Sequence, residues 1–193
     1  MNAASRPSRS TRDRLLETAS RLFYERGFQA VGVDEIAAQS GVAKMTMYRH
    51  FPSKDDLVVA YLKRSENAFC DWFERALGTE RDPRDKIVAV FTAVGALAQS
   101  EQCLGCTFQV SAAEYPDPVH PANRVAVRHK REVRKRFATL AAEAGLRDPD
   151  ALADELLMLM DGAWVAARMF GRPNPARHVA SAAESLLRGH RRG

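Results

Sequence analysis

The sequence has few features of an exported, membrane-embedded or disulfide-bonded protein. Its three cysteines are few and odd in number, which argues against a disulfide framework and fits a reducing compartment. The longest apolar run, Ile87 to Ala98, is well short of the roughly 20 residues that a membrane-spanning helix needs. The amino terminus carries arginines but no apolar segment of a secretory signal. We therefore expect a soluble, cytoplasmic protein with no membrane partner.

The chain also lacks the patterns of β-structure and of common catalytic sites. No stretch of useful length alternates apolar and polar residues, and no internal repeat is present. There is no glycine-rich phosphate loop, no Ser-His-Asp pattern with a strand-borne nucleophile and no recognisable carboxylate pair. The sequence predicts an all-α protein of about nine helices that is not an enzyme and uses no cofactor.

Cap residues, glycines and prolines set the expected helix boundaries. Ser10 precedes a first helix that ends at Gly27, and Ser53 precedes a long helix that ends at Gly78 and links two domains. The expected helices cover about residues 11–26, two short helices within 33–51, then 54–77, 83–100, 107–114, a helix ending near 145, 149–170 and 176–187.

The most informative segment, residues 28–57, predicts two short helices joined by a tight turn and followed by a third. Counting Val33 as first, Ala37 is fifth, Gly41 ninth and Met47 fifteenth. A small alanine lets two helices cross closely, a glycine tolerates the left-handed backbone of the turn, and a long apolar side chain fixes the second helix on the first. This spacing predicts a helix-turn-helix unit that reads DNA.

This segment, with the helix before it, resembles the tetracycline-repressor (TetR) family of bacterial one-component transcriptional regulators. The resemblance rests on Leu22, Phe23, Gly27, Phe28, Val33, Ile36, Ala37, Gly41, Val42 and the run Lys44-x-Thr46-x-Tyr48-x-His50-Phe51-x-x-Lys54-x-x-Leu57. It covers residues 10–62, and a weaker likeness to one subgroup's effector domain covers residues 103–146. Gly32 and Ala43 stand where the family usually has hydroxyl residues, so two side-chain helix caps are missing.

We expect the second short helix to lie in the major groove of double-stranded operator DNA. Val42, Met47 and Phe51 should point inward, and the expected DNA-binding residues are Lys44, Met45, Thr46, Tyr48, Arg49, His50 and Lys54. The charge distribution agrees, because residues 1–54 hold nine Lys/Arg against five Asp/Glu, a net of +4, whereas the remainder has a net of +1. Arg6, Arg9 and Arg12 form an arm along the DNA or a solvated tail.

The predicted domains are a flexible basic arm (1–9), a helix-turn-helix domain (10–56), an effector-binding and dimerisation domain (57–188) and a flexible tail (189–193). The resemblance implies a pocket for a small, mostly apolar effector in the second domain. Its candidate lining residues are Phe69, Trp72, Phe73, Phe91, Phe108, Gln109, Met160, Asp161 and Trp164. Glu114 is a further polar candidate, and ordinary core packing is the alternative for every aromatic side chain.

A homodimer is expected because one short helix makes few base contacts, so specific binding usually needs two half-sites. The last two helices carry apolar stripes, and the resemblance implies that they form the interface. The candidate interface residues are Leu152, Leu156, Leu159, Ala163, Val179, Ala183, Leu186 and Leu187.

The function that these features predict is a ligand-responsive regulator, most simply a repressor that an effector releases from a palindromic operator. Two alternatives remain open at this point. One is a thiol-responsive regulator that uses Cys103 and Cys106, and the other is a small helical enzyme or carrier. No metal site is predicted, because the spacing of Glu114, Asp117, His120 and His129 selects no particular ion.

Overall fold

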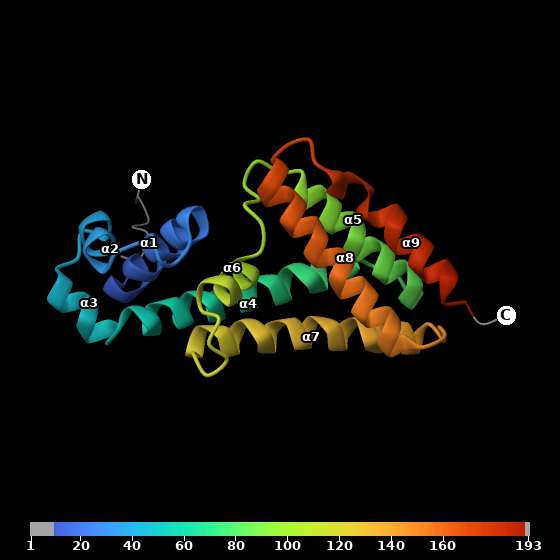
Figure 1. Cartoon of the computed structure of the whole chain (residues 1–193), viewed down its shortest axis with the longest axis horizontal. Coiled ribbons are helices and arrows are strands. Elements are labelled where there is room, and N and C mark those ends of the chain that lie inside the picture. Colours follow the sequence, from blue (N-terminus) through green and yellow to red (C-terminus); the bar gives the residue numbers. More distant parts are fainter. Residues whose placement is uncertain (1–9, 192–193) are drawn as a thin grey trace, which may run out of the picture.

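The computed structural model describes residues 10–191, which form α-helices and one 3-10 turn without any strand. The all-α expectation is therefore confirmed. In Figure 1, the short amino-terminal helices lie at one end, and the long helices α4 and α7 run side by side along the molecule. The elements are α1 (Thr11–Arg26), α2 (Val33–Ser40), α3 (Lys44–His50), α4 (Lys54–Leu77), α5 (Pro83–Ala98), α6 (Thr107–Glu114), α7 (Pro121–Glu143), α8 (Pro149–Phe170), η1 (Pro175–His178) and α9 (Val179–Gly189).

Local capping explains why the first and fourth helices begin where the sequence predicts. The Ser10 hydroxyl accepts a hydrogen bond from the Asp13 amide at 3.1 Å, and the Ser53 hydroxyl accepts one from the Asp56 amide at 3.0 Å. Gly32 and Ala43, which precede α2 and α3, make no such bond. The two short helices are therefore held mainly by packing against their neighbours.

Two hydrophobic clusters divide the molecule, and α4 contributes to both. One contains buried residues of α1, α2 and α3, the first half of α4, and parts of α6 and α7, including Phe108, Tyr115 and Val125. The other contains the buried faces of α5, α8 and α9 with Phe73 and Phe137. The packing around the helix-turn-helix thus extends beyond the predicted boundary at residue 56, because α6 and α7 complete its core.

The carboxy-terminal helix differs from its expected range. Asn174 accepts a hydrogen bond from the Ala176 amide at 3.0 Å, and a 3-10 turn precedes α9. The helix continues to Gly189, and ring nitrogens of His190 lie 2.7 Å from the Arg147 carbonyl oxygen and 3.1 Å from a Glu155 carboxylate oxygen. The described part of the expected tail is therefore held against α8, whereas the expected arm at residues 1–9 lies outside the described residues.

Candidate nucleic-acid interface and effector cavity

The turn between α2 and α3 has the geometry that its glycine predicts. Gly41 adopts a left-handed backbone with φ of 64°. The guanidinium of Arg14, on α1, donates to the Ser40 carbonyl oxygen at 2.7 Å and to the Gly41 carbonyl oxygen at 3.2 Å. These bonds satisfy carbonyl groups at the end of α2 and fix the turn against α1.

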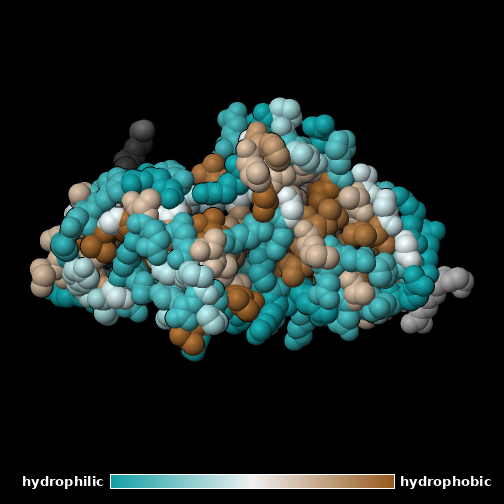
Figure 2. Space-filling model, viewed as in Figure 1, coloured by the Kyte–Doolittle hydropathy of each residue, from teal (hydrophilic) through white to brown (hydrophobic). Residues whose placement is uncertain are grey.

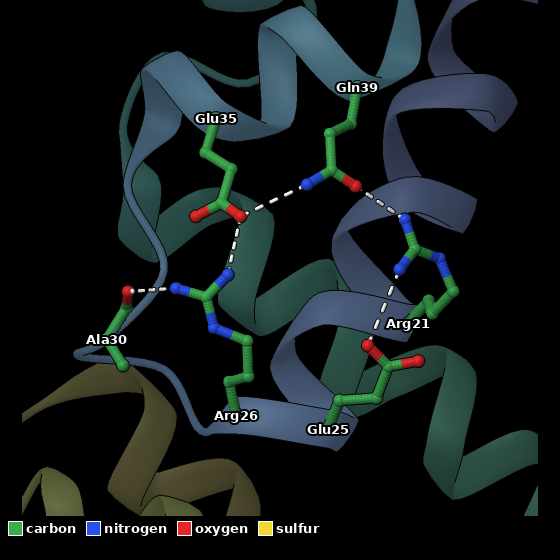
Figure 3. A network of polar contacts seen from close by, with 6 residues as sticks. All are labelled: Arg21, Glu25, Arg26, Ala30, Glu35 and Gln39. Carbon is green, nitrogen blue, oxygen red and sulfur yellow. Dashed lines mark hydrogen bonds and ion pairs between the residues drawn. The ribbon is translucent and has the colours of Figure 1, made fainter.

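A polar network holds α2 on α1 (Figure 3). Arg26 donates to Glu35 at 2.5 Å and to the Ala30 carbonyl oxygen at 3.1 Å. Gln39 donates to the same Glu35 carboxylate at 3.1 Å and accepts from Arg21 at 2.6 Å. Because two positions of α2 are tied to two positions of α1, the helix that supports α3 has little freedom to rotate.

The orientation of α3 agrees with the sequence analysis. Val42, Met47 and Phe51 are buried, as expected, while Met45 is 77% exposed. The other side chains expected to face DNA are exposed or half-buried: Lys44, Arg49 and His50 are exposed, and Thr46, Tyr48 and Lys54 are half-buried. One face of α3 is therefore free to enter a groove. Arg12 of the expected arm instead lies in α1, with its guanidinium 4.9 Å from the centre of the Phe51 ring.

Asp34 is a feature of this face that the sequence analysis missed. Its carboxylate accepts from the Lys44 ammonium at 2.6 Å, and this hydrogen bond raises the pKa of Lys44. Both side chains are exposed, so the pair is weak and exchangeable. To bind a base or a phosphate, Lys44 would have to leave or share Asp34.

A cavity of about 340 Å³ lies where α4, α6, α7 and α8 meet the loop before α6. Of the predicted lining residues, Phe69, Trp72, Phe108, Met160 and Trp164 line this cavity. Phe73 and Phe91 do not, because both are buried in the core around Phe137. Gln109 and Asp161 also lie outside it, in a separate groove between α6, α7 and α8, where Gln109 donates to the Asp161 carbonyl oxygen.

Aromatic rings form much of the wall. The ring centres of Phe69 and Trp72 are 5.4 Å apart, and those of Trp72 and Trp164 are 6.1 Å apart in an edge-to-face arrangement. Ala68 and Leu97, also in the wall, are exposed to solvent and mark the mouth of the cavity. The remaining lining residues are Tyr24, Tyr61, Ser65, Cys103, Gly105, Cys106, Thr107, His129, Lys130 and Val133.

Tyr24 and Tyr61 were not predicted, yet they connect the cavity to the DNA-binding end. Tyr24 belongs to α1, and its hydroxyl accepts a hydrogen bond from the Leu104 amide at 2.8 Å. Tyr61 could have been found, because it shares a face of α4 with Ser65, Phe69 and Trp72 at helical spacing. Tyr24 gives no such signal, since its position depends on how α1 packs against the distant loop.

Most of the predicted dimer-interface residues are buried within the protomer, which leaves little of their surface for a partner. Leu152, Leu156, Ala163, Val179, Ala183 and Leu187 are buried in the protomer's own core, and Leu159 and Leu186 pack against it. The reason is that α8 is apolar around most of its surface, and its largest stripe fills the core of its own chain. The opposite side of α8 exposes Met158, Val165 and Met169, beside a shallow groove that Leu159, Gly162, Ala166 and Ala182 help to line. We name these residues the α8–α9 outer face; apolar side chains gather over this region in Figure 2.

Comparison with known proteins identifies the family. Residues 15–61 match the model of bacterial regulatory proteins of the tetR family. A TetR-family transcriptional regulator from Streptomyces coelicolor has 33% sequence identity and a TM-score of 0.84, over 93% of this chain and 95% of its own. A TetR-type regulator from Streptomyces avermitilis has 35% identity and the same TM-score, over 94% and 98%. The chain belongs to the TetR family of transcriptional regulators, which confirms the resemblance seen in the sequence.

Curated relatives carry the names of DNA-binding regulators. The HTH-type transcriptional repressor KstR2 of Mycolicibacterium smegmatis is 29% identical over 181 residues, which are 88% of this chain and 85% of that protein. The HTH-type transcriptional activator FasR of the same organism is 39% identical over 87 residues, which are only 45% of this chain and 40% of FasR. Within residues 10–191, no helix is long and apolar enough to cross a membrane, and no three His, Cys, Asp or Glu side chains gather as a metal site.

Proposed function

We propose that this protein is a homodimeric repressor that a small, mostly apolar molecule releases from a palindromic operator. The observation that carries the proposal is the shared wall of the aromatic cavity. Tyr24 of α1 lines the cavity and also belongs to the helix that positions the helix-turn-helix. A ligand that fills the cavity therefore touches the DNA-binding end directly. Repression is favoured over activation because the similarity to KstR2 spans most of both chains, whereas that to FasR spans less than half of each.

DNA recognition in this proposal uses the exposed face of α3. Lys44 and Met45 reach base edges, while Thr46, Tyr48, Arg49 and His50 contact phosphates or flanking bases. Lys54 adds a positive charge at the amino terminus of α4, where the helix dipole also favours a phosphate.

Helix α6 and the loop before it couple the cavity to the DNA-binding end, because contacts of both reach α1 and the residues after it. In the loop, the Leu104 amide donates to Tyr24, as described above. At the carboxy-terminal end of α6, one carboxylate oxygen of Glu114 accepts from the Phe28 and Gln29 amides at 2.8 and 2.7 Å. The close approach requires glycine at position 27, where φ is 82° and a Cβ atom would overlap the Glu114 carboxylate. Between these two contacts, Thr107 and Phe108 line the cavity.

The coupling therefore has a simple physical form. A ligand that shifts α6 away from α4 or α7 also moves the points at which α1 is held, and so changes the separation of two helix-turn-helix units in a dimer. Only a difference in ligand affinity between the two arrangements produces this effect. The dimer itself is proposed to form through the α8–α9 outer face.

A thiol-responsive mechanism is less well supported. Burial raises the pKa of Cys103, which disfavours the reactive thiolate. The family relatives are regulators of transcription, so the enzyme or carrier alternative also has no support beyond the presence of a cavity.

The test begins with selection of bound duplexes from random DNA, followed by a screen of apolar compounds for release of the selected operator. Trp72 and Trp164 both line the cavity, so a ligand that binds there should change the intrinsic fluorescence. The proposal requires reciprocity: a compound that weakens operator binding by a given factor must bind the operator complex more weakly by the same factor. Release by thiol oxidation, with no effect of any apolar compound, would replace this proposal with the thiol-responsive one.

A further inference from the structure

His129 is a buried polar residue whose ring nitrogens have no hydrogen-bond partner among residues 10–191. Its side chain lines the aromatic cavity and is 3% exposed. The other buried polar residues, Ser40, Ser111, Asn123 and Asn174, each donate a hydrogen bond to a backbone carbonyl. Buried polar groups are nearly always hydrogen-bonded, so the ring nitrogens, which border the cavity, must take their partner from a ligand or a water molecule inside it.

The ring is held firmly in place. Phe108 stacks on it with ring centres 3.7 Å apart, and Phe69 meets it edge to face with ring centres 4.8 Å apart. Both phenylalanines also line the cavity. The imidazole is thus fixed between the walls of the cavity and cannot rotate freely towards solvent to find a partner.

The imidazole is neutral at physiological pH. Burial, together with the nearby charges of Lys130, Arg136 and Arg128 on the same helix, lowers the pKa of His129 to about 3. Each of these cations is paired with a carboxylate from α4 or α8, namely Asp161, Glu74 and Glu66 respectively. A neutral imidazole offers one N–H donor and one acceptor nitrogen.

Three other titratable groups of the wall have pKa values shifted towards their uncharged forms. Burial raises the pKa of Tyr24 to about 12 and raises the pKa values of Tyr61 and Cys103. Lys130 is the charged residue of the wall, and its ammonium is already paired with Asp161. A charged ligand would lose its hydration here without gaining a free counter-charge.

We infer that the ligand of this cavity is an uncharged, largely aromatic molecule with a hydroxyl or carbonyl group that hydrogen-bonds to His129. This inference rests on the proposed role of the cavity as the effector site and narrows the chemical class of the effector. The cavity volume of about 340 Å³ is near the lower end of the range for ligand sites. A ligand of two fused rings suits this size, and its faces can pack against Phe69, Trp72 and Trp164.

Three ligands of matched shape test the inference by calorimetry at pH 7: naphthalene, 2-naphthol and 2-naphthoate. We expect 2-naphthol to bind about 3- to 10-fold more tightly than naphthalene, the effect of one net hydrogen bond. The anion 2-naphthoate should bind most weakly. The affinity for 2-naphthol should not change between about pH 5.5 and 7.5, because His129 stays neutral throughout this range.

Two substitutions assign the preference to His129. His129→Phe keeps a ring between Phe69 and Phe108 but removes both nitrogens, so 2-naphthol and naphthalene should bind it with equal affinity. His129→Gln restores a neutral donor and acceptor and should restore the preference for 2-naphthol. Retained naphthalene binding shows that each variant still forms the cavity.

Several results would overturn the inference: equal binding of 2-naphthol and naphthalene to the unaltered protein, tighter binding of 2-naphthoate, binding of none of the three, or a persistent preference in His129→Phe. Operator release is measured in parallel and separates this inference from the proposed function. If the three ligands bind in the expected order but none releases the operator, the inferred ligand class is supported and ligand-controlled repression is contradicted.

Discussion

The two ends of the molecule present chemically different surfaces. Among residues 10–62, Met45 is the one large apolar side chain that is exposed, and Lys44, Arg49 and His50 of the same helix are exposed as well. The α8–α9 outer face instead exposes Met158, Val165 and Met169 around a groove of small residues. The first surface suits a hydrated polyanion, whereas the second suits another apolar protein surface. In the proposed function, DNA binding and self-association therefore use different surfaces, which substitutions should disrupt separately.

The largest effect is expected from blocking the α8–α9 outer face. Gly162 lies in this groove, and a Cβ atom there would meet nothing within 4 Å beyond the adjacent residues and backbone of its own helix. Gly162→Arg should therefore leave the protomer folded but place a bulky charge in the proposed dimer interface. Loss of the second half-site should weaken operator binding by about 100-fold or more. Sedimentation at micromolar concentration measures the oligomeric state.

The matched control is Thr139→Arg, a comparable change at an exposed position of α7. It should leave both the dimer and the operator affinity unchanged. A dimer that survives Gly162→Arg would place the interface elsewhere. Leu156→Glu does not serve this purpose, because Leu156 is fully buried in the core and the substitution would unfold the protomer.

A smaller effect is expected at the DNA-binding end, where specifying and positioning contacts should differ. Lys44→Ala should relax base preference at one position in each half-site and cost about 1 to 3 kcal/mol. Lys54→Ala should weaken binding to all DNA sequences alike. It should also reduce the slope of the logarithm of the binding constant against the logarithm of salt concentration by about one unit per half-site. Binding isotherms at several salt concentrations distinguish the two. If Lys44→Ala left the base preference unchanged, the prediction that this residue of α3 reads a base directly would be wrong.

The sequence predicts structural features that depend on residues close together in the chain better than features that depend on packing between distant helices. The helix-turn-helix was predictable because Ala37, Gly41 and Met47 have local steric roles at fixed spacing, and the structure has buried Met47 and a left-handed Gly41. The exposed face of α8 was not predictable, because the run from Leu156 to Met160 is apolar at every position. Periodicity cannot choose a face on such a helix, and packing against α5 and α7 made the choice.

The cavity was partly predictable for a related reason. Phe69 and Phe91 look alike in sequence, yet Phe69 lines the cavity and Phe91 stacks on Phe137 in the core. Which aromatic side chain faces empty space depends on how closely the surrounding helices approach one another. Contacts between distant segments, such as those of Tyr24 and Glu114, leave no pattern in the sequence at all.

The link between the two ends should weaken when Glu114 loses its charge. Hydrogen bonds to a charged acceptor are worth about 1.5 to 3 kcal/mol, and those to a neutral amide about half as much. Glu114 does not line the cavity, so Glu114→Gln should bind the effector normally. The factor by which the effector weakens operator binding should fall by roughly 3- to 10-fold. Glu132→Gln, at an exposed position of α7, is the control and should change neither quantity.

The smallest expected effect concerns Asp34, which competes with DNA for Lys44. Asp34→Asn removes a negative charge that is 76% exposed beside the DNA-binding face and releases the Lys44 ammonium. Operator affinity should rise by about 2- to 5-fold at low salt, and the gain should shrink as salt screens the interaction. Lys44→Ala combined with Asp34→Asn should show less of this gain, since part of it requires the lysine. A fall in affinity would instead mean that Asp34 itself contacts DNA, for example as an acceptor for a cytosine amino group. A rise in operator affinity would therefore show that Asp34, near the start of α2, competes with DNA for Lys44, whereas a fall would show that Asp34 belongs to the DNA-recognition surface.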